Sequence, residues 1–188
     1  SFCEASDALG ICSRVCKWFQ VAALHSSAWP TLKIRSGAAE QSIDSLCSIL
    51  MSISTGLQLL TLDLTFQHRD LGVALPGELI LRHLQRLELK LNDLEANIFA
   101  CDLLGCIESP QLRDVKIMAP LTPQLLNAIS MTLLPTNGKL NSLKLTALPS
   151  RNMEVLLDTG TLTALQELLE ITPELSKLMI SLEDPSGG

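Results

Sequence analysis

The sequence predicts an α/β fold in which short parallel strands lie side by side and helices cover one face of the sheet. Three observations lead to this prediction. A leucine-rich strand pattern recurs at nearly constant spacing, and helical apolar patterns fill the intervals between its copies. Hydrophobic residues make up 47% of the chain and aromatic residues only 3%, which suits a core of stacked aliphatic side chains better than a sandwich centred on large rings.

The strand pattern is clearest in LQRLELKLND, residues 84–93. Leucines at positions 87, 89 and 91 alternate with Glu88 and Lys90, which is the period of a strand with one buried face. A further leucine at position 84 completes the frame L-x-x-L-x-L. Copies of this frame begin at positions 29, 57, 84, 112, 140 and 175, the first of them weak, so the steps are 28, 27, 28, 28 and 35 residues. A step held this closely indicates a structural repeat.

The intervals between the first four strands predict helices that return the chain to the same edge of the sheet. Residues 38–54 carry a regular helical stripe, and residues 94–107 carry a less regular one. Residues 76–84 begin with Pro76 and make a short helix at most. The apolar positions expected to face the core are Ile43, Leu46, Ile49, Leu50 and Ile53 in the first helix and Leu94, Ile98, Leu104 and Ile107 in the last.

The two remaining intervals differ in length. The helix expected after the fourth strand has Thr122 as its cap and Pro123 just inside. Its inward positions are Leu125, Leu126, Ile129 and Leu133. The last interval is longer by about two helical turns, and it predicts two helical segments, residues 151–158 and 163–171, broken around Gly160.

The recurring frame resembles that of leucine-rich repeats. This resemblance implies an open solenoid over residues 37–188, with a parallel sheet on its concave face and helices on its convex face. Regular repeats carry Asn or Cys directly after the strand, and here Asn92 fills that slot. The other copies carry unrelated residues there, namely Thr65, Pro120, Leu148 and Glu183. The repeats are therefore expected to be degenerate, with irregular turns.

Residues 1–36 predict a short helical segment followed by a first, irregular strand. The motif SRVCKWF at residues 13–19 and the motif WPTLKI at residues 29–34 resemble the second half of an F-box. The helix L-P-x-E-[IL]-L that normally opens an F-box is absent from the sequence. The alternative interpretation is an amphipathic cap that shields the first repeat, with Trp18 and Trp29 in its core.

An F-box followed by leucine-rich repeats is similar to the substrate-recognition subunits of cullin–RING (SCF-type) ubiquitin ligases. The resemblance implies that the F-box binds a Skp-type adaptor, and through it a cullin, while the concave face binds a protein substrate in the cytoplasm or nucleus. The candidate adaptor-binding residues are Val15, Cys16, Trp18, Phe19 and Trp29. The candidate substrate-binding residues are Thr61, Asp63, Glu88, Lys90, Lys116, Met118, Lys144 and Thr146. The alternative function is a leucine-rich-repeat scaffold or inhibitor with no link to ubiquitin ligases.

Three of the candidate residues carry positive charge on successive strands. Lys90, Lys116 and Lys144 would lie about 5 Å apart from strand to strand, and they predict a modest basic strip that reads an acidic or phosphorylated segment of a partner. The alternative is that they are ordinary solvated positions of strands.

Composition argues against several other classes of function. The net charge of −6 gives no electrostatic case for nucleic acid, and no apolar run is long enough to span a membrane. The six cysteines lie mostly in apolar patterns, which is typical of a reduced, intracellular protein, and their spacing does not favour a zinc site. The three histidines have no clustered partners and no phosphate-binding loop is present. We therefore expect neither catalysis nor a cofactor in this chain.

The two ends of the sequence suggest a piece of a longer protein. The chain begins without Met or a signal-like segment and stops in EDPSGG directly after a strand. We expect the last strand to expose an apolar edge, and the chain by itself to be of marginal stability or prone to aggregation.

Overall fold

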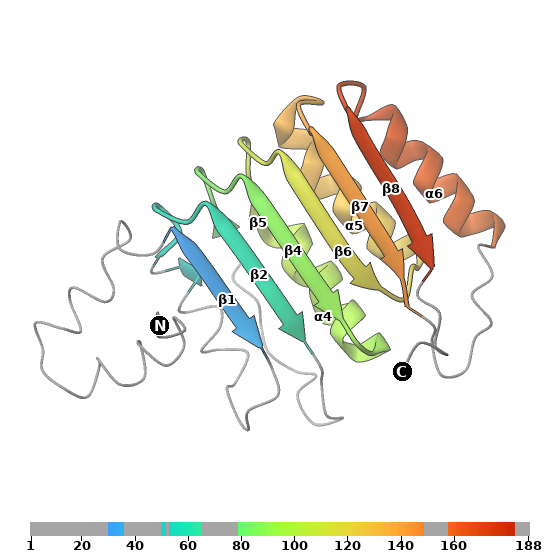
Figure 1. Ribbon diagram of the computed structural model, residues 1–188, viewed down its shortest axis with the longest axis horizontal. Coiled ribbons are helices and arrows are strands. Elements are labelled where there is room, and N and C mark those ends of the chain that lie inside the picture. Colours follow the sequence, from blue (N-terminus) through green and yellow to red (C-terminus); the bar gives the residue numbers. More distant parts are fainter. Residues whose placement is uncertain (1–29, 36–49, 52, 65–78, 149–157, 183–188) are drawn as a thin grey trace, which may run out of the picture.

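The computed structural model describes residues 30–35, 50–51, 53–64, 79–148 and 158–182. Within them, six strands form a parallel sheet in the order β1-β2-β4-β6-β7-β8, so that each new strand is added beside the previous one (Figure 1). The strands are β1 (Thr31–Arg35), β2 (Leu59–Leu64), β4 (Arg86–Leu91), β6 (Asp114–Ala119), β7 (Ser142–Ala147) and β8 (Lys177–Leu182). The predicted α/β class and its parallel sheet are confirmed.

The helices of the described residues lie together on one side of this sheet (Figure 1). They are α4 (Leu94–Cys106), α5 (Pro123–Leu133), which the short 3-10 helix η2 (Leu134–Thr136) extends, and α6 (Thr159–Glu170). Helix α5 contacts both α4 and α6. No described segment covers the opposite side of the sheet, which we call the open face.

Aliphatic side chains form continuous rows between the sheet and the helices. One row runs through Leu60, Leu87, Val115 and Leu143, and the next through Leu62, Leu89, Ile117 and Leu145. None of these side chains is more than 3% exposed. Burial of such a side chain stabilises by about 1.5–3 kcal/mol before entropy is subtracted, so the rows are the main source of cohesion between units.

Backbone hydrogen bonds fix the register where the strands begin. The carbonyl oxygen of the residue before a strand accepts the N–H groups of two successive residues of the next copy, at 2.8–3.1 Å. The accepting carbonyls, which we call the carbonyl row, belong to Pro30, Gln58, Gln85, Arg113 and Asn141. Each strand therefore starts at the same level as its neighbour, whatever the length of the interval between them.

Side-chain caps explain where the three helices begin. Asp93 Oδ1 accepts a hydrogen bond from the Ala96 N–H group at 2.6 Å, and Asp158 Oδ1 accepts one from Thr161 at 2.7 Å. The predicted Thr122 cap is confirmed, because its Oγ1 accepts from the Leu125 N–H group at 3.2 Å. All four inward positions predicted for α5 are buried.

Residues 76–84 do not form the predicted helix where the structure describes them. Leu79–Ile80 is instead a two-residue strand, β3, which pairs in parallel with β5 (Ile107–Glu108). Leu79 and Leu81 are both buried two positions apart, and the Leu81 N–H group donates to the Glu108 carbonyl at 2.9 Å. This spacing of two belongs to an extended chain rather than to a helix.

The predicted apolar stripe of α4 is partly wrong. Ile98 is exposed, and Ile107 lies in β5, although both Leu104 and Ile107 are buried as expected. The buried surface of the helix is formed by Ala96, Asn97, Phe99, Ala100, Leu103 and Leu104. Small alanines and a buried asparagine thus take positions that a search for large aliphatic residues assigns to solvent.

Gly160 does not break the last helix. Helix α6 starts at Thr159, directly after its cap Asp158, and passes through Gly160 in its first turn. Of the other expected segment, residues 151–158, Asp158 is the cap of α6 and residues 151–157 lie outside the described residues. Of the helix expected at residues 38–54, Leu50 and Ile53 are helical and fully buried, and the remaining predicted positions lie outside the described residues.

Buried side chains also join neighbouring units through hydrogen bonds. Asn97 Nδ2 donates to the Pro120 carbonyl at 2.9 Å. Across the contact between α4 and α5, the Thr132 hydroxyl lies 2.8 Å from the Leu104 carbonyl, to which it can donate. Ser109 Oγ donates to the Leu84 carbonyl at 3.0 Å. Each bond links segments about one repeat apart, so the units are held together by polar as well as apolar contacts.

The last strand has no neighbour on its outer edge among the described residues. Its core-facing side chains, Leu178, Ile180 and Leu182, are exposed, and Leu162 on α6 is exposed as well. The predicted apolar edge is confirmed.

Candidate functional site

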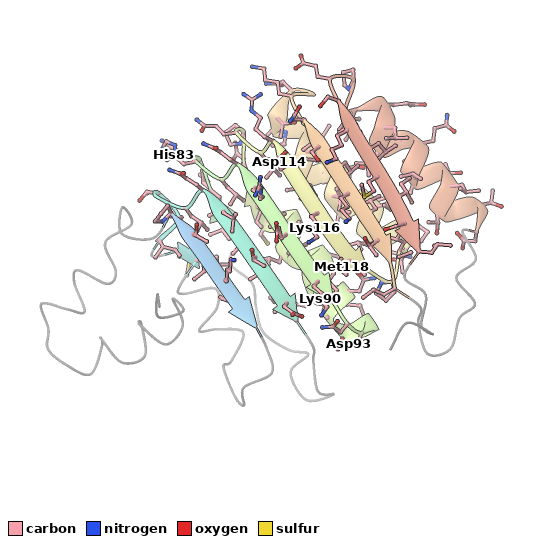
Figure 2. The ribbon with its side chains drawn as sticks, in the orientation of Figure 1. His83, Lys90, Asp93, Asp114, Lys116 and Met118 are labelled. Carbon is pink, nitrogen blue, oxygen red and sulfur yellow. The ribbon has the colours of Figure 1, made fainter. Side chains whose placement is uncertain are left out.

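The outward side chains of the strands line up in rows across the open face (Figure 2). The first row, nearest the strand starts, comprises Thr31, Leu59, Arg86, Asp114, Ser142 and Lys177. The second row comprises Lys33, Thr61, Glu88, Lys116, Lys144 and Met179. The third row includes Asp63, Lys90, Met118, Thr146 and Ser181. Because neighbouring strands lie about 4.8 Å apart, each row forms a continuous line of side chains.

All eight candidate substrate-binding residues lie in these rows. Thr61, Glu88, Lys116 and Lys144 belong to the second row, and Asp63, Lys90, Met118 and Thr146 belong to the third. The structure therefore brings these residues together on one face. Their role in binding remains a prediction.

Ion pairs neutralise the part of the open face built by β2, β4 and the start of β6. Lys90 Nζ lies 3.7 Å from Asp63 Oδ2, and Asn92 Nδ2 donates to Asp63 Oδ1 at 3.0 Å. Arg86 Nη2 lies 3.5 Å from Asp114 Oδ2. Exposed pairs of this kind contribute about 0–1 kcal/mol to stability, so their main effect here is to balance charge.

The predicted basic strip is reduced to two lysines. Lys116 and Lys144 are direct register partners on β6 and β7, whereas Lys90 is the register partner of Met118 in the next row and pairs with Asp63. The sequence already distinguishes Lys90 from the other two lysines. Lys116 and Lys144 stand four residues after the start of their copies, whereas Lys90 stands six residues after the start of its own copy and therefore belongs to a different row.

Four further outward residues of the last two strands lie in these rows, namely Ser142, Lys177, Met179 and Ser181. Lys177 lies in the first row beside Ser142, and Ser181 Oγ lies 3.0 Å from Thr146 Oγ1 in the third. Lys177 is absent from the candidates predicted from the sequence. The period of two in a strand could have identified it, because it stands two residues before the outward Met179. Thr61 Oγ1 is buried and has no hydrogen-bond partner among the described residues.

The described residues offer little to a metal ion or a small molecule. No group of three His, Cys, Asp or Glu side chains among them is placed to hold a metal. A gap between the sheet and helices α4 and α5 is lined by aliphatic side chains and Thr132, and it is too narrow to admit a water molecule.

The two cysteines that the structure describes are not activated. Burial, and then the nearby Asp102 carboxylate, raise the pKa of the Cys101 thiol and of the Cys106 thiol. A raised pKa keeps a thiol protonated, which is the opposite of what a nucleophile or metal ligand requires.

The candidate adaptor-binding residues Val15, Cys16, Trp18, Phe19 and Trp29 lie outside the described residues. In the described ranges, no helix combines the length and the apolar character needed to cross a bilayer. Comparison of the chain with protein-family models, with curated protein sequences and with solved structures returned no match. The fold and the open face together define an α/β protein with an exposed, polar sheet surface.

Proposed function

We propose that the chain is a leucine-rich-repeat protein that binds a protein substrate through the open face, as the substrate-recognition part of a cullin–RING ubiquitin ligase. One observation supports the binding role above all others. Six parallel strands follow one another in chain order, and their outward side chains form aligned rows that no described segment covers.

The repeat assignment is supported by what recurs from strand to strand. The steps of 28, 27, 28 and 28 residues coincide with consecutive neighbours in the sheet, and the carbonyl row repeats at the same points. Asn92, in the slot that regular repeats fill with Asn, donates from Nδ2 to the Leu64 carbonyl of the preceding strand at 3.2 Å. Units that contact only their neighbours are the principle of a solenoid, in which the open face would be the concave wall.

The dimensions of the open face favour a protein partner over a small molecule. Six strands at about 4.8 Å spacing, each about 20 Å long, give a surface of roughly 24 by 20 Å. A standard protein–protein interface buries about 800 Å² on each partner, which is the same order of area. Small molecules bind in enclosed concavities instead.

The link to ubiquitin ligases is supported by the F-box-like sequence of residues 1–36. In this proposal Val15, Cys16, Trp18, Phe19 and Trp29 contact a Skp-type adaptor in the full-length protein, and the open face holds the substrate in the cytoplasm or nucleus. The chain itself would perform no chemistry, because ubiquitin transfer belongs to the other subunits. A scaffold or inhibitor without this link would use the open face in the same way.

Co-purification separates these two functions. The full-length protein is expressed with an affinity tag, and the purified material is probed for the adaptor and the cullin. We expect both to be recovered, and we expect Trp18→Ala to lose them while Glu4→Ala, in the same segment, retains them. If the adaptor is absent while unrelated F-box proteins recover it from the same lysate, the ligase link is wrong and the scaffold function remains.

A further inference from the structure

Among the described residues, the positive charges that β4 places on the open face are paired, whereas those of β6, β7 and β8 are not. Arg86 and Lys90 each have an acidic partner, Asp114 and Asp63 respectively. Lys116, Lys144 and Lys177, which we call the lysine patch, have no ion pair among the described residues. All three stand on the adjacent strands β6, β7 and β8.

The arrangement of the lysine patch is unfavourable unless an anion binds there. Lys116 and Lys144 are register partners, so their backbones lie about 5 Å apart, and like charges directly opposite each other destabilise a sheet. Glu88 is the register partner of Lys116 on its other side, but no ion pair joins the two. Lys116 and Lys144 are also partly buried, whereas Lys177 is exposed, and the three share a local positive potential on a protein whose net charge is −6.

The residues around the lysine patch suit a peptide more than a bare ion. Met118 and Met179 offer polarisable apolar contacts beside the lysines, and Ser142 offers a hydroxyl. We propose that this half of the open face binds an acidic, extended segment of a protein partner. The inference rests on the proposed function, because it names the chemistry of the partner that the open face holds.

The spacing of the lysine patch matches that of an extended acidic chain. From β6 to β8 the distance is about 10 Å, which an extended segment crosses in about three residues. Carboxylates at alternate positions of that segment lie about 7 Å apart on one side of it. Two of them reach the Lys116–Lys144 pair and Lys177, and the intervening side chain points away.

A labelled peptide tests this inference directly. The probe is a synthetic twelve-residue peptide of alternating Glu and Ser, and the matched control peptide carries Gln in place of every Glu. Binding to the 188-residue chain is followed by fluorescence anisotropy at low salt. We expect the acidic peptide to bind at least about tenfold more tightly than the control peptide, and its affinity to fall as ionic strength rises.

Charge-removing variants then locate the site. The double variant K116Q/K144Q is expected to weaken binding of the acidic peptide by about tenfold or more. Lys33→Gln changes one charge in the same row on β1, at the opposite end of the sheet, and it is expected to change affinity less than about twofold. Thermal unfolding followed by circular dichroism checks that each variant keeps its fold.

Three outcomes would overturn the inference. They are equal affinity for the two peptides, equal effects of K33Q and K116Q/K144Q, and preferential binding of a dodecameric deoxythymidine oligonucleotide with the same dependence on the lysine patch.

Cross-linking of captured proteins tests the proposed function separately from the acidic segment. If a protein captured by the full-length chain cross-links to the open face but tolerates K116Q/K144Q, the receptor function holds and only the acidic segment is wrong. If captured proteins never cross-link to the open face, the proposed receptor function is wrong.

Discussion

Strands β7 and β8 carry the same apolar frame and lie in register, yet their core-facing side chains differ in exposure. Leu143 and Leu145 on β7 are 0% exposed, whereas their register partners Leu178 and Ile180 on β8 are 44% and 41% exposed. Strand β7 has a strand on either side, and β8 has only β7 among the described residues. The sequence pattern thus determines which side chains face the core, but the neighbouring units determine whether that core is closed.

We expect the largest effect on stability from truncating core-facing side chains of β7, and a much smaller effect from the same change on β8. Leu145→Ala leaves a cavity in a fully buried row, so we expect a loss of about 2–5 kcal/mol in the free energy of unfolding. Ile180→Ala removes a side chain that is already partly hydrated, so we expect a loss below about 1 kcal/mol. Chemical denaturation of the two variants measures both values. Equal losses would show that β8 is covered in solution.

Two glycines at contacts between neighbouring units should respond differently to an added methyl group. Gly138, in the turn before β7, has φ +77°, and an added Cβ would lie 3.0 Å from Pro173 Cδ in the turn before β8. Gly138→Ala is therefore expected to lower the free energy of unfolding by about 1–3 kcal/mol. Gly160→Ala, in the first turn of α6, meets Pro123 Cγ at 3.4 Å and should be neutral or stabilising by up to about 1 kcal/mol. Thermal unfolding of both variants provides the measurement, and a destabilised Gly160→Ala protein would contradict it.

Buried threonines distinguish contacts between units from contacts within one. The Thr132 hydroxyl lies 2.8 Å from the Leu104 carbonyl of the neighbouring helix, whereas the Thr172 hydroxyl, just after α6, donates to the Leu168 carbonyl of that helix in the same unit at 3.1 Å. We expect Thr132→Val to cost about 1 kcal/mol and Thr172→Val to cost less. Hydrogen exchange would add the decisive observation, since only Thr132→Val should weaken protection of amides in both α4 and α5.

The smallest effect concerns the pH dependence of the outermost helix. The hydroxyl and N–H groups of Thr161 lower the pKa of the Asp158 carboxyl below its ordinary value. A lowered pKa in the folded state means that the ionised form stabilises the helix at pH values above the unfolded pKa, about 3.9. This contribution is lost as the pH falls through the folded pKa. Asp158→Asn keeps a capping side chain without a titrating group, so its unfolding below about pH 4 should depend less on pH than that of the unsubstituted chain.

The sheet was predictable because its signal is repeated. The copies of the apolar frame that start at positions 29 to 140 are 27 or 28 residues apart, so an ambiguous copy such as the first is corrected by the others. The pair β3–β5 could not be found in this way, because two-residue strands carry no period. Ile98 was assigned to the core because it is large and aliphatic, whereas the phase of α4 is set by the Asp93 cap and by the packing of Phe99 and Leu103.

The candidate site was predictable in its location and less so in its charges. The frame places every outward residue on one face, but the two ion pairs depend on how long side chains reach from one strand to the next within a row. Asp63 pairs with Lys90 in the same row, and this removes Lys90 from the strip that its charge alone suggests. Lys177 was missed because it stands at the first position of its strand, where the alternation has only begun.

The carbonyl row has a consequence for how such a chain can change over time. The last interval is 35 residues long where the others are 27 or 28, yet the Asn141 carbonyl accepts the N–H groups of Ser176 and Lys177 just as Arg113 accepts those of Asn141 and Ser142. The longer interval therefore leaves the anchoring bonds of the carbonyl row in place. Insertions and deletions between the strands can accumulate without shifting the pattern of side chains on the open face, so the two sides of the protein are free to diverge at different rates.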